Sequence, residues 1–443
     1  MSTYPASQTP ALGTAAPDAL ADAYRAITWR LIPFLFVLWV LAWMDRVNVG
    51  FVKLTMLDEL KWSETVYGLG AGIFFLGYFF FEVPSNLLLQ KIGARKTIMR
   101  ITIGWGVVCV AMMYAKTPTM FYLLRFLMGV FEAGFYPGII LYLTYWYPSG
   151  RRAKAFGMFM SASAVAGVLG GPLAGTVMNN LHGANGWSGW QWVFLIEGIP
   201  SIIAGVVTWF YLTDRPAQAQ WLSAEQRKLV EDDLKRDAGA LGQREEGLLA
   251  SLKDGRLWLL VLIYFCVIAA NSSLTFFGPS VVKEAGFTNP ATIGWIMSLS
   301  YLCGAAGMIL NGRHSDHAQE VRRHCAIAAA AGAAGLVLTT VFLHVNPVLA
   351  LVAQTLAIVG TMSAIPVFWQ LPGRFLAGAA AAGGVALINS IANLAGFGAP
   401  FMLGVIKTQT GGLSPGLLVV AAVEVCATVL ILMFIPRFAK VAK

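Results

Sequence analysis

The stretch LLVVAAVEVCATVLILMFIP, residues 417–436, decides the fold class because it is long and predominantly apolar. A helix needs about 20 such residues to cross the hydrocarbon core of a bilayer. Similar stretches recur along the chain, with apolar cores that include Leu31–Trp43, Val66–Leu89, Ile101–Tyr114 and Phe159–Val177. Hydrophobic residues make up 57% of the 443 residues and charged residues only 12%, whereas soluble domains carry about 25% charged residues. The sequence therefore predicts an all-α integral membrane protein.

Twelve spans are predicted, and one long polar stretch divides them into two pseudo-symmetric bundles of six helices. The predicted spans are 29–52, 66–90, 97–115, 119–146, 154–179, 190–212, 256–282, 291–311, 324–344, 347–369, 375–407 and 414–436. This division gives four segments: a disordered cytoplasmic tail over 1–27, an N-terminal bundle over 28–213, a cytoplasmic linker over 214–254 and a C-terminal bundle over 255–437.

The distribution of basic residues predicts the orientation of the chain. Loops that follow even-numbered spans carry basic clusters, whereas loops that follow odd-numbered spans carry few basic residues. The clusters are Lys91, Arg95, Lys96 and Arg100; Arg151, Arg152 and Lys154; and Arg313, Arg322 and Arg323. Because positively charged loops remain in the cytoplasm, we expect both termini there. The placement of the +9 net charge in short loops argues against a nucleic-acid partner.

The two halves resemble each other in the turn after the second helix of each. The first half reads NLLLQKIGARK at Asn86–Lys96, and the second reads GRHSDHAQEVRR at Gly312–Arg323. Both resemble the glycine–three residues–aspartate–basic loop of the major facilitator superfamily. The second half keeps Gly312 and Asp316, which we expect to form a gating latch. The first half has Asn86 and Gln90 instead, so its latch would lack the charge. Internal repeats of this kind are typical of transporters.

Several ionisable residues lie inside predicted spans. They are Asp45, Arg46, Glu82, Arg125 and Glu132. Each charge costs about 2.5–3.5 kcal/mol at the bilayer centre unless it faces a cavity or a partner. An arginine can hold a carboxylate through two parallel hydrogen bonds, and desolvation of a carboxyl group favours its protonated form. The set therefore suits a carrier that binds an organic anion together with a proton. The alternative is structural: buried ion pairs, snorkelling at the interface, or, for Glu82, hydrogen bonding to backbone groups freed by Pro84.

A family resemblance rests on five stretches: MDRVNVG at Met44–Gly50, GYFFFEVPSNLLL at Gly77–Leu89, RFLMGVFEAGFYPG at Arg125–Gly138, YWYPSGRRAKA at Tyr145–Ala155 and NLAGFGAP at Asn393–Pro400. Over roughly residues 28–437 the chain resembles the anion:cation symporter branch of the major facilitator superfamily, close to its bacterial tartrate, phthalate and hydroxyphenylacetate permeases.

The resemblance implies roles for the residues inside the spans. Asp45 and Glu132 would carry protons, and Arg46 would contact the substrate carboxylate. Arg125 would organise the site, and Asn393 would line it. Independently of the resemblance, we expect a further group either to line a central cavity or to serve ordinary helix packing: Tyr78, Asn271, Ser272, Phe276 and Trp369.

The expected function is proton-coupled symport of a small organic carboxylate, either a tartrate-like hydroxy acid or an aromatic acid such as phthalate. Transport would proceed by alternating access in a bacterial inner membrane, with the protein acting as a monomer. The chain has no ATP-binding loop, so transport would draw on an ion gradient. We expect no cofactor and no metal. A uniporter, an antiporter and a non-transporting membrane sensor remain alternatives. A membrane enzyme is disfavoured because HExxH and GxSxG motifs are absent.

Overall fold

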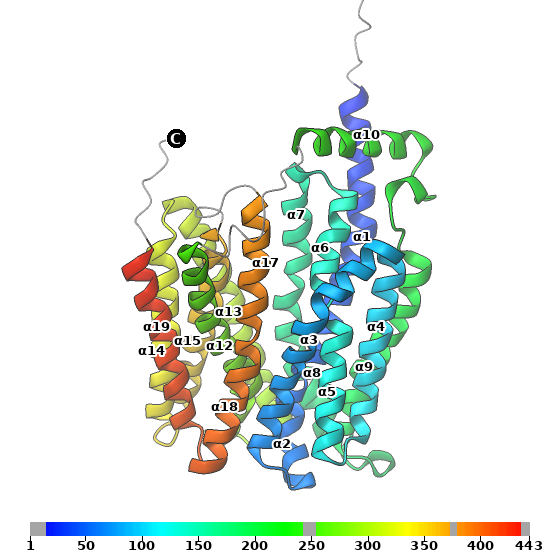
Figure 1. Cartoon of the computed structure of the whole chain (residues 1–443). Coiled ribbons are helices and arrows are strands. Elements are labelled where there is room, and N and C mark those ends of the chain that lie inside the picture. The colour runs from blue at the N-terminus through cyan, green and yellow to red at the C-terminus, as the bar shows by residue number, and fades with distance from the viewer. Residues whose placement is uncertain (1–14, 242–253, 373–378, 436–443) are drawn as a thin grey trace, which may run out of the picture.

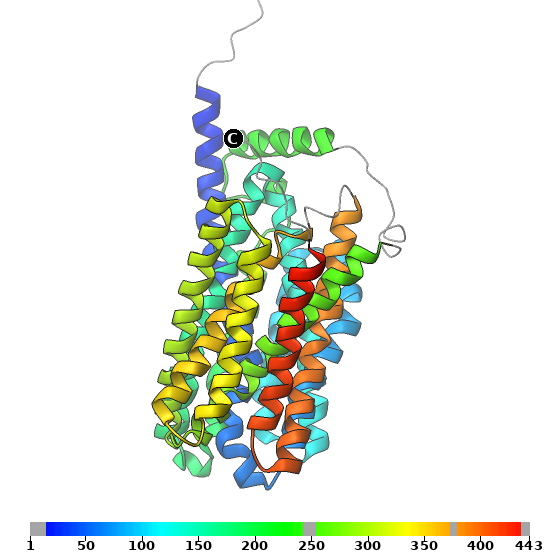
Figure 2. The same cartoon turned by 90° about the vertical axis from the view of Figure 1, so that its left-hand side faces the viewer.

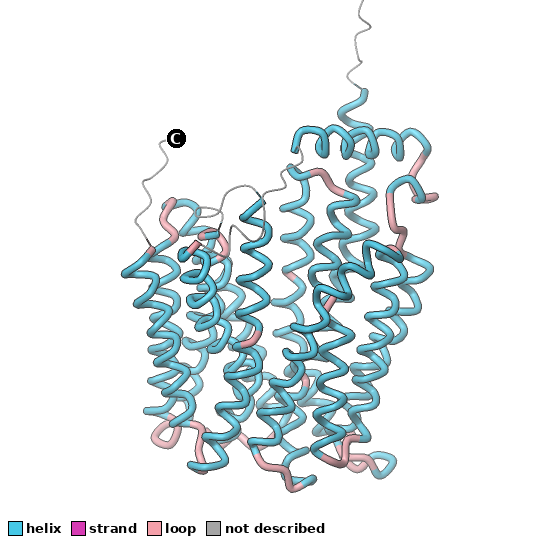
Figure 3. The backbone as a smooth tube through the Cα atoms, in the orientation of Figure 1, coloured by secondary structure: helices cyan, strands magenta, loops and turns pink. Residues whose placement is uncertain are grey.

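A computed structural model describes residues 15–241, 254–372 and 379–435 of the chain. Within these ranges every regular element is a helix, as Figure 3 shows. Twelve of the helical stretches are long and apolar enough to cross a membrane. The twelve spans predicted from the sequence are therefore confirmed.

Several spans consist of two helices in succession. The N-terminal half contains α1 (Ala15–Val47), α2 (Val49–Leu60), α3 (Glu64–Ile92), α4 (Ala94–Ala111), α5 (Pro118–Glu132), α6 (Phe135–Trp146), α7 (Ser149–Met160), α8 (Ala162–Asn180) and α9 (Gly189–Tyr211). The linker contains α10 (Ala224–Leu241). The C-terminal half contains α12 (Gly255–Glu284), α13 (Pro290–Ala318), α14 (Arg322–Phe342), α15 (Pro347–Phe368), α17 (Ala379–Asn393), α18 (Ala395–Thr410) and α19 (Ser414–Phe434).

Local sequence explains where several of these helices begin. Thr117, Asn289 and Asn346 each precede a proline at the first helical position of α5, α13 and α15. In each case the side-chain oxygen of the capping residue accepts a hydrogen bond from a backbone N–H in the first turn. Proline tolerates this position because the first N–H groups of a helix lack intrahelical partners. These signals fix the first residues of α5, α13 and α15.

The linker helix α10 lies across one end of the N-terminal half (Figures 1 and 2). Asp237 of α10 accepts hydrogen bonds from the backbone N–H (2.9 Å) and hydroxyl (2.5 Å) of Ser149 at the start of α7. Asp233 accepts a hydrogen bond of 2.8 Å from the hydroxyl of Tyr24 in α1. A carboxylate at a helix N-terminus is also favoured by the helix dipole. We call this end of the molecule the linker end and the opposite end the distal end.

Two boundaries differ from those expected. Residues 15–27, assigned to a disordered tail, belong to α1, and Ala23, Tyr24 and Ile27 are buried; residues 1–14 lie outside the described ranges. The helix α1 begins before the predicted span because these side chains pack against the rest of the half. In the second half, α13 extends to Ala318, so Gly312 and Asp316 lie in its last turns and not in a loop.

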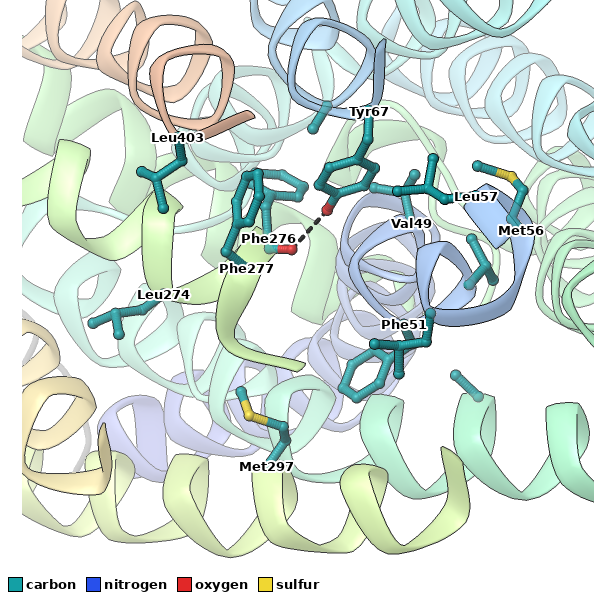
Figure 4. Packing of buried hydrophobic residues seen from close by; sticks show 14 of the residues in the cluster. Val49, Phe51, Met56, Leu57, Tyr67, Leu274, Phe276, Phe277, Met297 and Leu403 are labelled. Carbon is teal, nitrogen blue, oxygen red and sulfur yellow. Dashed lines mark hydrogen bonds between the residues drawn. The ribbon is translucent and has the colours of Figure 1, made fainter. Parts of the chain in front are cut away.

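The two halves pack against each other at the distal end, chiefly through α3 with α18 and α8 with α13. The backbones come close where Gly68 of α3 faces Pro400 and Gly404 of α18, and a Cβ at Gly68 would overlap the carbonyl oxygen of Pro400. Figure 4 shows Tyr67 beside Phe276 in this core, where the tyrosine hydroxyl donates a 2.7 Å hydrogen bond to the Phe276 carbonyl. The distal end of the structure is therefore closed.

Candidate functional site

An ion pair joins Arg46, in the last turn of α1, to Glu132, the last residue of α5. The Nε of Arg46 donates to Oε1 of Glu132 at 2.9 Å, and Nη2 of Arg46 donates to the same oxygen. The side chain of Glu132 is only 2% exposed, so the pair lies in a low-dielectric environment where charges interact strongly. Any other carboxylate that binds this guanidinium must compete with Glu132.

Aromatic rings surround the guanidinium of Arg46. The centroids of the Trp39, Trp43, Phe74 and Tyr78 rings lie 5.9, 5.2, 5.3 and 5.6 Å from its central carbon. Rings at this distance attract a cation through their negative faces and exclude water from it. Tyr78, a predicted lining residue, therefore does lie beside Arg46, together with three rings that the sequence did not single out.

Arg125, the second predicted arginine, is fully buried and faces α3. Its Nε donates to the carbonyl of Gly70 at 3.2 Å and its Nη2 to the carbonyl of Ala71 at 3.5 Å. Its central carbon lies 5.1 Å from the Phe74 ring, which also contacts Arg46. Arg125 thus fastens α5 to α3 behind the Arg46–Glu132 pair, a position that suits an organising role better than direct contact with a ligand.

Asp45 points away from the ion pair although it is the neighbour of Arg46. Adjacent residues of a helix point about 100° apart, and Asp45 faces α4 and α9. Its Oδ2 accepts a 2.5 Å hydrogen bond from the hydroxyl of Ser201, and its Oδ1 accepts one of 3.3 Å from the thiol of Cys109. The two carboxylates predicted to carry protons, Asp45 and Glu132, therefore lie in separate hydrogen-bond networks.

A further buried carboxyl group, Glu197 of α9, was missed in the sequence. Its Oε2 accepts a 2.9 Å hydrogen bond from the amide of Asn48, which lies three residues after Asp45 between α1 and α2. The signal was available, because Glu197 interrupts the apolar run of the span predicted at 190–212. Like Glu132, Glu197 is an ionisable group inside a predicted span, where a charge is costly without a partner.

Of the remaining predicted lining residues, Phe276 and Ser272 of α12 are buried in helix packing. The Phe276 ring packs edge-on against Phe75 of α3, with centroids 6.0 Å apart, so this side chain belongs to the contact between the halves. Asn271, by contrast, is partly exposed.

Trp369 and Asn393 lie in the C-terminal half. The indole of Trp369 donates a 3.1 Å hydrogen bond to the hydroxyl of Tyr264 and packs on its ring. Asn393 is partly exposed and is the last residue of α17, where the eleventh span bends into α18. Glu82 of α3 accepts a 3.2 Å hydrogen bond from Ser390 of α17, so it connects the halves.

The predicted gating residues occupy helix ends. Asp316 of α13 accepts a 2.9 Å hydrogen bond from the side chain of Gln370, just after α15. Gly312 has open space where a side chain would lie. In the first half, the side-chain amide of Asn86 donates a 2.9 Å hydrogen bond to the carbonyl of Glu82 in its own helix. Nearby in the sequence, the backbone N–H of Arg95 donates a 2.7 Å hydrogen bond to Asp214.

A second charged cluster closes the distal end. Glu64 of α3 forms ion pairs of 2.8 Å with Lys53 of α2 and with Lys407 of α18. Lys283 of α12 pairs with Asp58 of α2 at 3.0 Å. These residues line a cavity of about 660 Å³ at the contact between the halves. Because Lys407 and Glu64 belong to different halves, their ion pair can exist only while this end is closed.

Comparisons with known proteins agree with this architecture. A model of the Major Facilitator Superfamily matches residues 34–400. A protein named "putative tartrate transporter" from Agrobacterium vitis is 45% identical over 415 residues, covering 94% of this chain and 95% of that protein. The inner membrane transport protein RhmT of Escherichia coli is 37% identical over 426 residues, covering 95% and 96%. Among solved structures, a bacterial homologue of the human lysosomal transporter Spinster, inward-facing and occupied, has a TM-score of 0.75 at 16% identity, covering 93% of this chain and 96% of that one.

Proposed function

Since this chain belongs to the Major Facilitator Superfamily, we propose that it is a proton-coupled symporter of a small organic carboxylate in the bacterial inner membrane. The relatives named for tartrate transport and for the inner membrane support the substrate class and the location. The observation that carries the proposal is the buried ion pair between Arg46 and Glu132.

The ion pair provides a physical reason for coupling. While Glu132 is ionised it occupies the guanidinium of Arg46 through two donors. Protonation of Glu132 removes its charge, weakens both bonds and frees Arg46 for the carboxylate of the substrate. Since an arginine binds a carboxylate through a planar fork of donors, the incoming anion takes the place of Glu132. Proton binding and anion binding then favour each other, and by linkage each raises the affinity for the other.

The other site residues have supporting roles in this proposal. Asp45 is a second proton carrier on α1, and Arg125 holds α5 against α3 so that Glu132 stays opposite Arg46. Tyr78, Asn271, Trp369 and Asn393 contact the body of the substrate. Each unit of positive charge that moves inward across 100 mV supplies about 2.3 kcal/mol, so protons in excess of the substrate charge allow an anion to accumulate.

We assign the linker end to the cytoplasm. The basic clusters of both halves lie at helix ends and turns on this side, and segments that carry such clusters stay in the cytoplasm. The distal closure around Glu64 and Lys407 then means that this conformation is closed toward the outside of the cell. Single cysteines in place of Glu231, on α10, and Asn180, at the distal end of α8, test the assignment: a membrane-impermeant thiol reagent added to intact cells should label only the second.

Transport by the purified protein in liposomes tests the function. An inward pH gradient, acid outside, should drive accumulation of radiolabelled tartrate or phthalate above the equilibrium level. A uniporter would equilibrate the substrate without accumulation, and an antiporter would require a counter-anion inside. A sensor would bind the substrate in a thermal-shift assay but would not transport it. Absence of gradient-driven accumulation across a panel of carboxylic acids that stabilise the protein would refute proton symport.

A further inference from the structure

Two carboxyl groups lie in one buried hydrogen-bond network between α1, α4 and α9. Asp45 accepts from Ser201 of α9 and from Cys109 of α4, at 2.5 and 3.3 Å. The amide of Asn48 lies 3.8 Å from the sulfur of Cys109 and donates to Glu197 at 2.9 Å. The network therefore connects Asp45 to Glu197 through Cys109 and Asn48.

Among the described residues, this network has two unpaired acceptors but only one unpaired donor beside it, the indole N–H of Trp105 near Asp45. Oε1 of Glu197 and Oδ1 of Asn48 are buried and have no hydrogen-bond partner, although both residues are more than nine-tenths buried. A buried acceptor without a donor costs about 1–3 kcal/mol, so two such atoms in one network require an explanation. A proton bound to the network supplies the missing donor.

The network also lacks a positive charge. Among the described residues, no basic side chain forms an ion pair with Asp45 or Glu197. The titratable groups that face the two carboxyls are Cys109 and, from α5, Glu132, while Arg46 is paired with Glu132. An ionised carboxylate buried without a partner is strongly disfavoured, and two of them in one network would also repel each other.

We propose that Glu197 binds a transported proton and that it does so as a pair with Asp45. This proposal rests on the proposed proton symport and adds to it a residue of α9. Because the two carboxyls share a network without a cation, the pair holds at least one proton in this conformation. It releases that proton when the network opens to water.

The packing divides the network between two parts of the fold. Gly106 of α4 and Gly198 of α9 lie so close that a Cβ on either would meet the backbone of the other helix. The helices α4 and α9, which carry Cys109, Ser201 and Glu197, therefore form a rigid pair. Asp45 and Asn48 belong instead to the stretch of α1 and α2 that also carries Arg46. A substrate that binds Arg46 and displaces this stretch separates Asp45 and Asn48 from Glu197, which connects anion binding to proton release.

The first test is the number of protons moved per substrate, measured from reversal potentials with tartrate in liposomes. Glu197→Gln should lower this ratio by one and flatten the pH dependence of uptake, while counterflow of tartrate continues. Glu424→Gln is a matched control, because Glu424 of α19 is also buried, its carboxyl group accepts a 2.7 Å hydrogen bond from Thr361, and it takes no part in this network. An unchanged ratio and pH profile in Glu197→Gln overturns the proposal.

The second test requires neither transport nor the Gln variant. Infrared difference spectra of the detergent-solubilised protein, recorded during acidification, report the C=O band of each carboxyl group that takes up a proton. Glu197→Asp retains a carboxyl group but should shift the band that belongs to this residue. A band that is the same in wild type and Glu197→Asp means that Glu197 binds no proton. If the wild type moves no protons with tartrate, the proposed symport fails, and the infrared result still decides whether Glu197 titrates.

Discussion

Glu132→Gln is the substitution that distinguishes a coupling residue from a static ion pair. Glutamine has nearly the same shape as a protonated glutamate and can still accept a hydrogen bond from Arg46, but it carries no charge. In the wild type two donors of Arg46 reach Oε1 of Glu132. Hydrogen bonds to charged groups contribute about 1.5–3 kcal/mol and neutral ones about 0.5–1.5 kcal/mol, so the variant loses about 1 kcal/mol in each of two bonds.

This loss sets the expected gain in substrate affinity. In the variant the anion displaces a neutral amide from Arg46 instead of the ionised carboxylate of Glu132, so its binding improves by up to about 2 kcal/mol, or about 30-fold at 1.4 kcal/mol per tenfold. The gain should appear at alkaline pH, where Glu132 is ionised in the wild type. At acid pH the two proteins should bind alike.

Calorimetric titration of tartrate at two pH values measures this difference, and counterflow and gradient-driven uptake in liposomes complete the assay. The variant should bind with little dependence on pH and continue counterflow, but lose accumulation. Glu424→Gln serves as the control for removal of a buried carboxyl group elsewhere. Unchanged alkaline affinity together with continued accumulation in Glu132→Gln would remove Glu132 from the coupling mechanism and leave Asp45 as the main candidate.

Three further changes test other parts of the structure. Arg46→Lys keeps the positive charge but loses the planar pair of N–H donors. The affinity for tartrate, measured by calorimetry, should fall at least tenfold while the melting temperature changes little. An affinity equal to that of the wild type would exclude Arg46 as the carboxylate contact. Lys407→Gln removes the ion pair with Glu64 across the distal end. A partly exposed pair contributes about 1 kcal/mol, so the ratio of molecules with an open distal end to molecules with a closed one should rise about fivefold. Distances between spin labels on α3 and α18 measure this ratio, and an unchanged distance distribution would contradict a role of the ion pair in closure. The hydrogen bonds from Ser149 lower the pKa of Asp237, so their contribution to docking of α10 is present above the ordinary aspartate pKa of about 3.9 and is lost as pH falls through the lowered value. Limited proteolysis of α10 should therefore increase in that acid range, and Asp237→Asn should show the increase already at neutral pH. Equal cleavage at all pH values would contradict a stabilising role of this contact.

The ends of the spans show where hydropathy no longer predicts which residues are helical. Twelve spans follow from the sequence because each helix must satisfy its own backbone hydrogen bonds in lipid, whatever its neighbours are. Outside the membrane this requirement disappears. Residues 15–27 are helical because Tyr24 and its neighbours pack on the N-terminal half and bond to α10, a contact between positions more than 200 residues apart.

The ionisable residues inside the spans could be found in the sequence, because the cost of each charge does not depend on its partner. Arg46, Glu132, Arg125 and Asp45 were identified in this way, and Glu197 follows the same rule. Their partners could not be predicted, because the direction of each side chain depends on how the helices pack. Only the tertiary structure directs Arg46 toward Glu132, Arg125 toward the backbone of α3, and Asp45 away from both and into the network of Glu197.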